Sequence, residues 1–173
     1  MQTDHFEQIV SEHYESLYRF AFSLTRVEAD ALDLTQQAFY LWATKGHQLR
    51  DRSKVKTWLF TTLHRAFLDA RRKQQRFFPS SLDELVSQEP PVLTVESTDN
   101  ADHVPVLQAL AQVDKSYQAA VALFYLGDNS YLEIAGILQV PIGTVKSRLA
   151  RGLAQLRQIL QCERTEECVE YVF

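Results

Sequence analysis

Apolar residues recur at steps of three and four along most of the chain, and no stretch of any length alternates as a strand would. This pattern predicts an all-α protein. The expected helices lie near residues 4–25, 28–45, 53–76, 105–113, 116–126, 130–138 and 142–161. One side of the last helix carries a row of apolar residues, namely Ile142, Val145, Leu149, Leu153, Leu156 and Leu160. That side is expected to face a core.

The helical pattern breaks once, between residues 78 and 105. This segment holds four of the five prolines, six acidic residues and no Lys or Arg. Because proline lacks a backbone donor and restricts the residue before it, we expect no continuous helix here. The segment is interpreted as an acidic, flexible linker between two small helical domains, residues 1–77 and 106–161, and residues 162–173 as a tail of unknown role.

The formal net charge of −4 conceals a segregation of charge along the chain. Residues 1–78 carry 12 Lys and Arg against 9 Asp and Glu, and residues 106–161 carry 5 against 3. Two basic blocks are therefore separated by an acidic one. This segregation says more about the partner of the chain than the total charge does.

The last two expected helices are joined by residues 139–141, too few to let them lie antiparallel. Such a connection favours the sharp crossing of a helix-turn-helix. Ser130 and Glu133 have the spacing of a capping box at the start of the first helix. Gln139 stands where many such turns have glycine, and a left-handed residue other than glycine costs about 1 kcal/mol. Gly127 is expected to end the preceding helix in a left-handed conformation.

Hydroxyl and guanidinium groups gather on another side of helix 142–161. The row consists of Thr144, Ser147, Arg148 and Arg151, with Lys146 beside it. Arginine can bind a guanine edge with two hydrogen bonds, whereas hydroxyls and lysine mainly position the DNA backbone. A solvated helix face is the alternative, but the short capped helix, the tight turn and the basic second helix together favour DNA as the partner.

Helix 28–45 has an outward face that is mostly polar and uncharged. The face comprises Asp33, Gln36, Gln37 and Tyr40, and Phe39 flanks it. Solvated helix surfaces usually carry Lys and Glu, so this stripe indicates a protein interface. Plain surface explains it equally well, and the residues alone leave both interpretations open.

Helix 53–76 is basic along its length and also carries aromatic residues such as Trp58. Rings beside cations suit single-stranded nucleic acid, because bases stack on the rings while the charges follow the phosphates. The alternative is an aromatic core with cations favoured at the helix end by the helix dipole. The residues alone leave both interpretations open here too.

Four motifs occur in order along the chain, namely DLTQQAF, TWLFTTLHRAFLDARRK, SYLEIAGIL and VPIGTVKSRLARGLAQLR. In this order they resemble the bacterial RNA polymerase sigma factors of the extracytoplasmic-function (ECF) group, over residues 5–76 and 106–161. The resemblance implies a region 2 domain and a region 4 helix-turn-helix domain. It further implies an alternative sigma factor that binds core polymerase, recognises and melts promoters, and directs transcription initiation.

The resemblance also implies roles for individual residues. By this resemblance, the residues that contact the clamp coiled coil of core polymerase are Asp33, Gln36, Gln37, Phe39 and Tyr40. The residues that bind the minus-ten promoter element are His47, Arg50, Arg52, Ser53, Lys56, Trp58, Arg65 and Arg72. The residues that bind the minus-thirty-five element are Thr144, Lys146, Ser147, Arg148 and Arg151. The polymerase flap and a dedicated anti-sigma factor are further implied partners. Gln37 departs from the family pattern, in which an acidic residue is common.

No constellation for catalysis is present, because the five histidines are scattered and no Gly-rich phosphate loop occurs. Cys162 and Cys168 are too few for a zinc site. We therefore expect no enzyme activity, no metal and no cofactor. Without a long apolar run or a signal-like start, we expect a cytoplasmic protein with no membrane insertion. The competing interpretations are a helix-turn-helix regulator that acts without polymerase and a helical interaction protein without nucleic-acid function.

Overall fold

The computed structural model describes residues 2–77 and 104–169, and within these ranges every regular element is a helix. The elements are α1 (Gln2–Thr25), α2 (Glu28–Lys45), the 3₁₀ turns η1 (Gly46–Gln48) and η2 (Arg52–Lys54), α3 (Val55–Phe77), α5 (Val104–Gln112), α6 (Lys115–Tyr125), α7 (Tyr131–Leu138) and α8 (Ile142–Val169). The all-α prediction is confirmed. Residues 78–103, most of the expected linker, lie outside the described residues. The last helix continues into the segment expected to be a tail.

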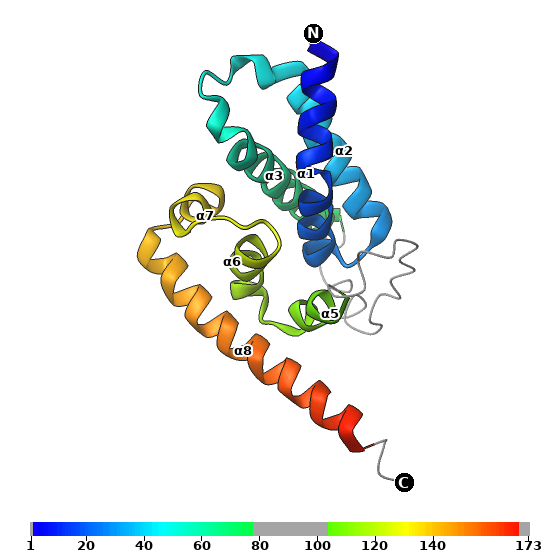
Figure 1. Cartoon of the computed structure of the whole chain (residues 1–173), viewed down its shortest axis with the longest axis vertical. Helices are drawn as coiled ribbons and strands as arrows, with labels where there is room; N and C mark the ends of the chain where they lie inside the picture. The colour runs from blue at the N-terminus through cyan, green and yellow to red at the C-terminus, as the bar shows by residue number, and fades with distance from the viewer. Residues whose placement is uncertain (1, 78–103, 170–173) are drawn as a thin grey trace.

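The first domain is a bundle of α1, α2 and α3, which pack against one another (Figure 1). Its centre is made of fully buried apolar residues, namely Leu17, Phe20, Leu59, Phe60 and Leu63. The Phe20 and Phe60 rings lie 5.4 Å apart between their centroids and so join α1 to α3. Nearer the loop that follows α2, the rings of Trp42 and Trp58 meet edge to face at 5.3 Å. Aromatic pairs of this geometry add to the free energy gained by burial.

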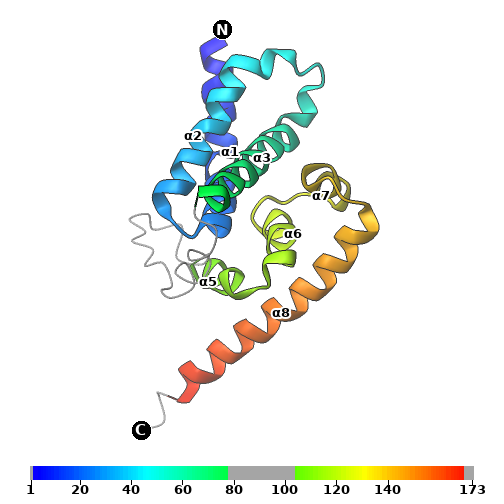
Figure 2. The same cartoon turned by 180° about the vertical axis from the view of Figure 1, so that it is seen from behind.

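The second domain is formed by α5 to α8, and its longest helix, α8, crosses α6 and then projects away from the rest of the molecule (Figures 1 and 2). The crossing depends on Gly152, because a Cβ atom there would lie 2.5 Å from Val121 Cγ2 and 3.0 Å from Tyr117 Cβ. Ile142 was expected on the buried side of this helix but is 40% exposed. It is the first residue of α8, whereas Val145, one turn later, is fully buried.

The turns around α7 confirm one expectation and correct another. The Ser130 amide donates to Glu133 Oε2 at 2.8 Å and the Glu133 amide to Ser130 Oγ at 3.3 Å, which is the predicted capping box. Gln139 is left-handed, with φ 56°. Gly127 is not, and the left-handed residue is Asp128, with φ 45°. Gly127 is needed for close approach, because a Cβ there would lie 2.9 Å from the Leu123 carbonyl oxygen.

The two domains are in direct contact in the folded chain. Helix α7 packs on α3, and α5 and α6 pack on α1, so the buried apolar residues of both domains form one cluster. The buried Gln118 side chain joins the domains, since its Nε2 donates to the Ser23 carbonyl oxygen at 2.9 Å and to the Leu110 carbonyl oxygen at 3.0 Å. The sequence did not predict this contact. In the part of the chain described here, no helix is both long and apolar enough to span a bilayer.

Candidate DNA and polymerase interfaces

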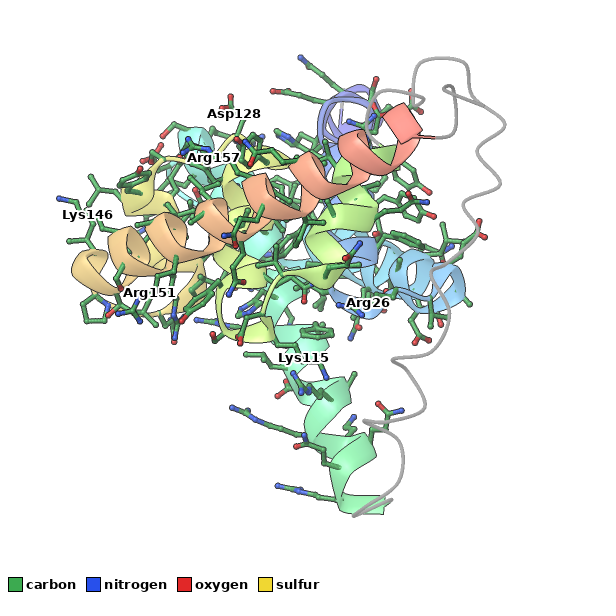
Figure 3. All side chains as sticks on the ribbon, turned by 90° about the horizontal axis from the view of Figure 1, so that it is seen from below. Arg26, Lys115, Asp128, Lys146, Arg151 and Arg157 are labelled. Atoms are coloured by element: carbon green, nitrogen blue, oxygen red, sulfur yellow. The ribbon has the colours of Figure 1, made fainter. Side chains whose placement is uncertain are left out.

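The polar row of α8 lies in the first turns of that helix, directly after the turn that joins it to α7. Ser147, Arg151 and Lys146 are exposed, whereas Thr144 and Arg148 are half-buried at the flanks of the packed side. Figure 3 shows Lys146 and Arg151 projecting from this end of α8, with Arg157 farther along the helix and on a different side from Arg151. The structure therefore brings the predicted residues together at one end of the helix. The buried residues Val145 and Leu149 lie between Lys146 and Arg148.

The turn before α8 is held by backbone hydrogen bonds. The amides of Thr144 and Val145 donate to the Pro141 carbonyl oxygen at 2.9 and 3.2 Å, and the Val140 amide donates to Ala135 at 3.2 Å. Val145 and Leu149 are buried, which fixes the rotation of α8 about its axis. Because both the turn and the rotation are fixed, the row is presented to a partner in one orientation.

A basic loop connects α2 to α3 over a platform of two tryptophans. It begins at Gly46, where a Cβ atom would lie 2.6 Å from the Trp42 ring, so the backbone passes directly over that ring. Trp58, half-buried, supports the same ring from α3. The predicted loop residues His47, Arg50 and Arg52 are exposed. The loop is thus anchored at its base while its polar side chains face outward.

Ser53, also predicted to contact DNA, is engaged within the loop. Its amide and its hydroxyl both donate to Asp51 Oδ1, at 3.1 and 2.6 Å, and cap η2. These two hydrogen bonds lower the pKa of the Asp51 carboxyl. Asp51 therefore stays ionised among the loop cations, and Ser53 shapes the loop.

The structure divides the residues predicted on α3 between two sides of the helix. Trp58, Arg65 and Arg72 are spaced by seven residues and lie on one side, and both arginines are exposed. Arg72 forms an exposed ion pair with Asp69 at 3.3 Å. Lys56 precedes Arg65 by nine residues, half a turn away around the helix. Its Nζ donates to the Asp128 carbonyl oxygen of the second domain at 2.6 Å.

The mostly uncharged face of α2 is open, with one exception. The exposed residues are Asp33, Gln36, Gln37 and Tyr40, and Tyr40 is 68% exposed. Phe39 is buried, and its ring stacks on Tyr14 of α1 at 6.3 Å between centroids. Phe39 therefore supports this face from beneath, while Asp33, Gln36, Gln37 and the Tyr40 ring form its surface.

His64 lies inside the first domain, on α3 next to Phe20. Burial lowers the pKa of its imidazole to about 4. The folded chain therefore holds His64 neutral, while the unfolded chain takes up a proton near pH 6.5. Stability should be fully present above about pH 6.5 and should fall by about 2–3 kcal/mol as the pH drops toward 4.

Urea unfolding between pH 4.5 and 7.5 checks this prediction. His64→Phe should flatten the pH dependence, because a phenyl ring fills the site without titrating. Some slope should remain, since burial also lowers the pKa of His13. An unchanged slope in the variant would contradict the assignment to His64.

Sequence reasoning missed the residues that join the two domains. Gln118 could have been found, because it precedes the buried Val121 and Ala122 by three and four positions and so lies on the core side of α6. A polar residue in that place predicts a specific hydrogen-bond partner. Thr57 and Glu133 carry no such signal, since their contact joins residues 76 positions apart.

Both domains match known families. Residues 9–77 match Sigma-70 region 2, and residues 103–156 match Sigma-70, region 4. The first match covers α3, α2 and most of α1, and the second covers the helix-turn-helix. The two matches follow one another in the order that the four motifs indicated.

Curated relatives and a solved structure agree with these matches. The chain is 31% identical to ECF RNA polymerase sigma factor SigL of Mycobacterium tuberculosis (strain ATCC 25618 / H37Rv), over 88% of this chain and 87% of the relative. It is 28% identical to RNA polymerase sigma factor SigV of Bacillus subtilis (strain 168), over 86% of each. ECF RNA polymerase sigma factor SigE of Mycolicibacterium smegmatis is 31% identical over 92% of this chain, which spans only 63% of that relative.

The fold is similar to that of sigma factor RpoE from Bartonella quintana, solved in complex with the anti-sigma factor NepR. The TM-score is 0.75 at 27% identity, and the match covers 91% of this chain and 97% of RpoE. Because it includes both domains, their mutual arrangement is similar as well. Family matches, relatives and fold agree, and the chain belongs to the ECF group of RNA polymerase sigma factors, which direct transcription initiation at particular promoters.

Proposed function

We propose that the first domain of this sigma factor binds core RNA polymerase and the minus-ten element, and that the second domain reads the minus-thirty-five element. The observation that carries the proposal is the pairing of two surfaces in one chain. An exposed, polar and mostly uncharged face lies on α2, and a polar and cationic row lies at the start of α8. A regulator acting alone would need only the second.

The minus-thirty-five element is read by the row on α8. Arg151 and Arg148 bind base edges in the major groove, where a guanidinium can make two hydrogen bonds to guanine. Thr144, Ser147 and Lys146 contact the phosphate backbone and set the register of the helix. The helix-turn-helix places the first turns of its second helix at the bases, which is where these residues lie.

The minus-ten element is opened by the α2–α3 loop and one side of α3. Arg65 and Arg72 follow the backbone of the separated strands, and the exposed part of the Trp58 ring offers a stacking surface beside them. His47, Arg50 and Arg52 surround a base turned out of the duplex, while Ser53 holds the loop in shape. Lys56, on the other side of α3, reaches DNA only when it leaves Asp128.

The α2 face docks on the clamp coiled coil of core polymerase through Asp33, Gln36, Gln37 and Tyr40, and the second domain lies near the flap. An anti-sigma factor that covers these faces keeps the chain inactive, as the complex of RpoE with NepR suggests. The chain acts in the cytoplasm and supplies no catalysis of its own. It contributes the binding of promoter DNA, and this binding determines at which promoters polymerase starts transcription.

Transcription in vitro tests the proposed function. Core polymerase with this chain should initiate at a limited set of promoters in genomic DNA, mapped by transcript starts, and core polymerase alone should not. Footprints should require both proteins, because each domain binds DNA weakly and polymerase fixes their separation. A footprint of full strength from the chain alone, with no effect on polymerase, would support a helix-turn-helix regulator instead.

A further inference from the structure

A single acidic residue lies among the cations of α3. The helix carries six Lys and Arg residues and one carboxylate, that of Asp69. Asp69 follows Arg65 by four residues and precedes Arg72 by three, so the three side chains share one side of the helix. This is the side proposed to meet the minus-ten element. A negative charge therefore lies on a surface that is expected to bind a negatively charged partner.

The fold gives no reason for this carboxylate. Within the described part of the chain its one polar partner is Arg72, whose Nη1 donates to Asp69 Oδ1 at 3.3 Å. The Asp69 side chain is 65% exposed, and an exposed ion pair within one helix contributes little to stability. Asp69 also lies more than two turns from either end of α3, so it caps neither end. Figure 3 shows the last turns of α3 projecting away from the other helices, which leaves this side open to a partner.

Phosphates alone would disfavour a carboxylate on this side, because like charges repel. The bases differ from the phosphates, since some of them offer hydrogen-bond donors. On their major-groove edges, guanine and thymine present only acceptors, adenine presents its N6 amino group beside the acceptor N7, and cytosine presents the N4 amino group alone. A carboxylate only accepts hydrogen bonds. Cytosine is therefore the base that fits Asp69 best.

Spacing along α3 places Asp69 opposite the bases. Arg65 and Arg72 are seven residues apart, which is about 10.5 Å along the helix axis. The same length covers about three nucleotides of a stacked strand, at about 3.4 Å each. With both arginines on phosphates, Asp69 faces the bases that lie between them. The bond from Arg72 holds the carboxylate by Oδ1 and leaves Oδ2 to accept from a base.

We propose that Asp69 determines base specificity within the minus-ten element, by accepting a hydrogen bond from the N4 amino group of one cytosine. The inference rests on the proposed function, because it names a base-reading residue on the surface assigned to that element. Arg65 and Arg72 supply affinity that does not depend on the base, and Asp69 supplies the choice of base. Opposite thymine the carboxylate would meet the O4 oxygen and repel it, so cytosine should be preferred over thymine by about tenfold.

A promoter library measures this preference. One promoter that core polymerase uses with the unchanged chain is randomised across its minus-ten element, and each member is identified by a barcode in its transcript. The unchanged chain should prefer cytosine over thymine by about tenfold at one position of one strand. Asp69→Ala should reduce that preference to within about twofold and leave the other positions as they were.

Asp69→Asn should change the preferred base at the same position. An Asn side chain both donates and accepts, which suits N7 and N6 of adenine, so the preference should move from cytosine toward adenine. Gln75→Lys is the matched control, because it raises the net charge by the same amount on the same helix. Gln75 is exposed and lies about 120° away from Asp69 around α3, so this variant should leave every base preference unchanged. Circular dichroism verifies that each variant is folded.

Arg72→Ala separates base reading from an effect that passes through Arg72. Loss of a phosphate contact should lower transcription about equally for all bases and should reduce the salt dependence of promoter binding by about one unit of slope. Asp69→Ala should instead act on one position and leave the slope no smaller. If Asp69→Ala behaves as Arg72→Ala does in both respects, Asp69 only positions Arg72 and the inference is wrong.

The remaining outcomes are distinct from one another. Transcription of the library with unchanged base preferences in Asp69→Ala and Asp69→Asn would overturn the inference and leave the proposed function in place. A preference for adenine in the unchanged chain that Asp69→Ala removes would overturn the assignment to cytosine. No transcription with the unchanged chain from any promoter would contradict the proposed function, and the inference with it.

Discussion

Replacing Arg148 and Arg151 together with Ala should abolish most promoter-specific transcription. Each arginine that binds a base edge contributes about 1–3 kcal/mol of discrimination, so losing both should reduce initiation at the cognate promoter by about 30-fold or more. The loss should be specific, since both residues lie at the end of α8 that enters the groove. Transcript yield from cognate and unrelated promoters, with saturating core polymerase, measures it.

Arg157→Ala provides the matched control on the same helix. Arg157 is exposed, as Arg151 is, but follows Arg148 by nine residues and so lies half a turn away around α8 (Figure 3). Its removal should change transcription by no more than about twofold, and equally at all promoters. Retained transcription in the double variant, or an equal loss with Arg157→Ala, would show that the row on α8 does not read the promoter.

Gly152→Val should be the most damaging single change to stability in the second domain. The new side chain would enter the contact between α8 and α6, where even a Cβ atom lies 2.5 Å from Val121 Cγ2 and where Val121 is fully buried. Separating the helices to make room should cost about 2–4 kcal/mol. Urea unfolding followed by circular dichroism measures the free energy of unfolding.

Gly136→Val separates this packing effect from the general effect of replacing a helical glycine. Gly136 lies within α7, and no atom comes within 4 Å of a Cβ built on it. The control should therefore change the free energy of unfolding by no more than about 0.5 kcal/mol. If the two variants lose stability equally, close packing at Gly152 is not the reason for its glycine.

Local features of the fold could be predicted from the sequence because neighbours along the chain produce them. Ser130 and Glu133 have the spacing of a capping box, and the structure contains both of its bonds. Gln139 was expected to adopt the left-handed conformation at some cost, and it does. Gly127 shows the limit of this reasoning. A glycine after a helix suggests a left-handed turn, but this one makes room for Leu123 and Phe60.

The candidate surfaces could be predicted in part, and the features that the sequence did not predict have a common cause. The row on α8 follows from helical spacing, and so does the open face of α2. Phe39 is buried because Tyr14 of another helix lies over it, and Lys56 points to the second domain because α7 lies there. Periodicity shows which residues share a side of one helix. It does not show which neighbour covers that side, since that neighbour is distant in the sequence.

The continuity of α8 has a mechanical consequence. Its 28 residues form one rod about 42 Å long, which rests on α6 at Gly152. The part from Ile142 to Gly152 is about 15 Å long and the part from Gly152 to Val169 about 25 Å, and the helix packs on α5, α6 and α7 along the way. Because α8 is one continuous helix, a force on its projecting end would be transmitted along the rod to the end that carries the polar row.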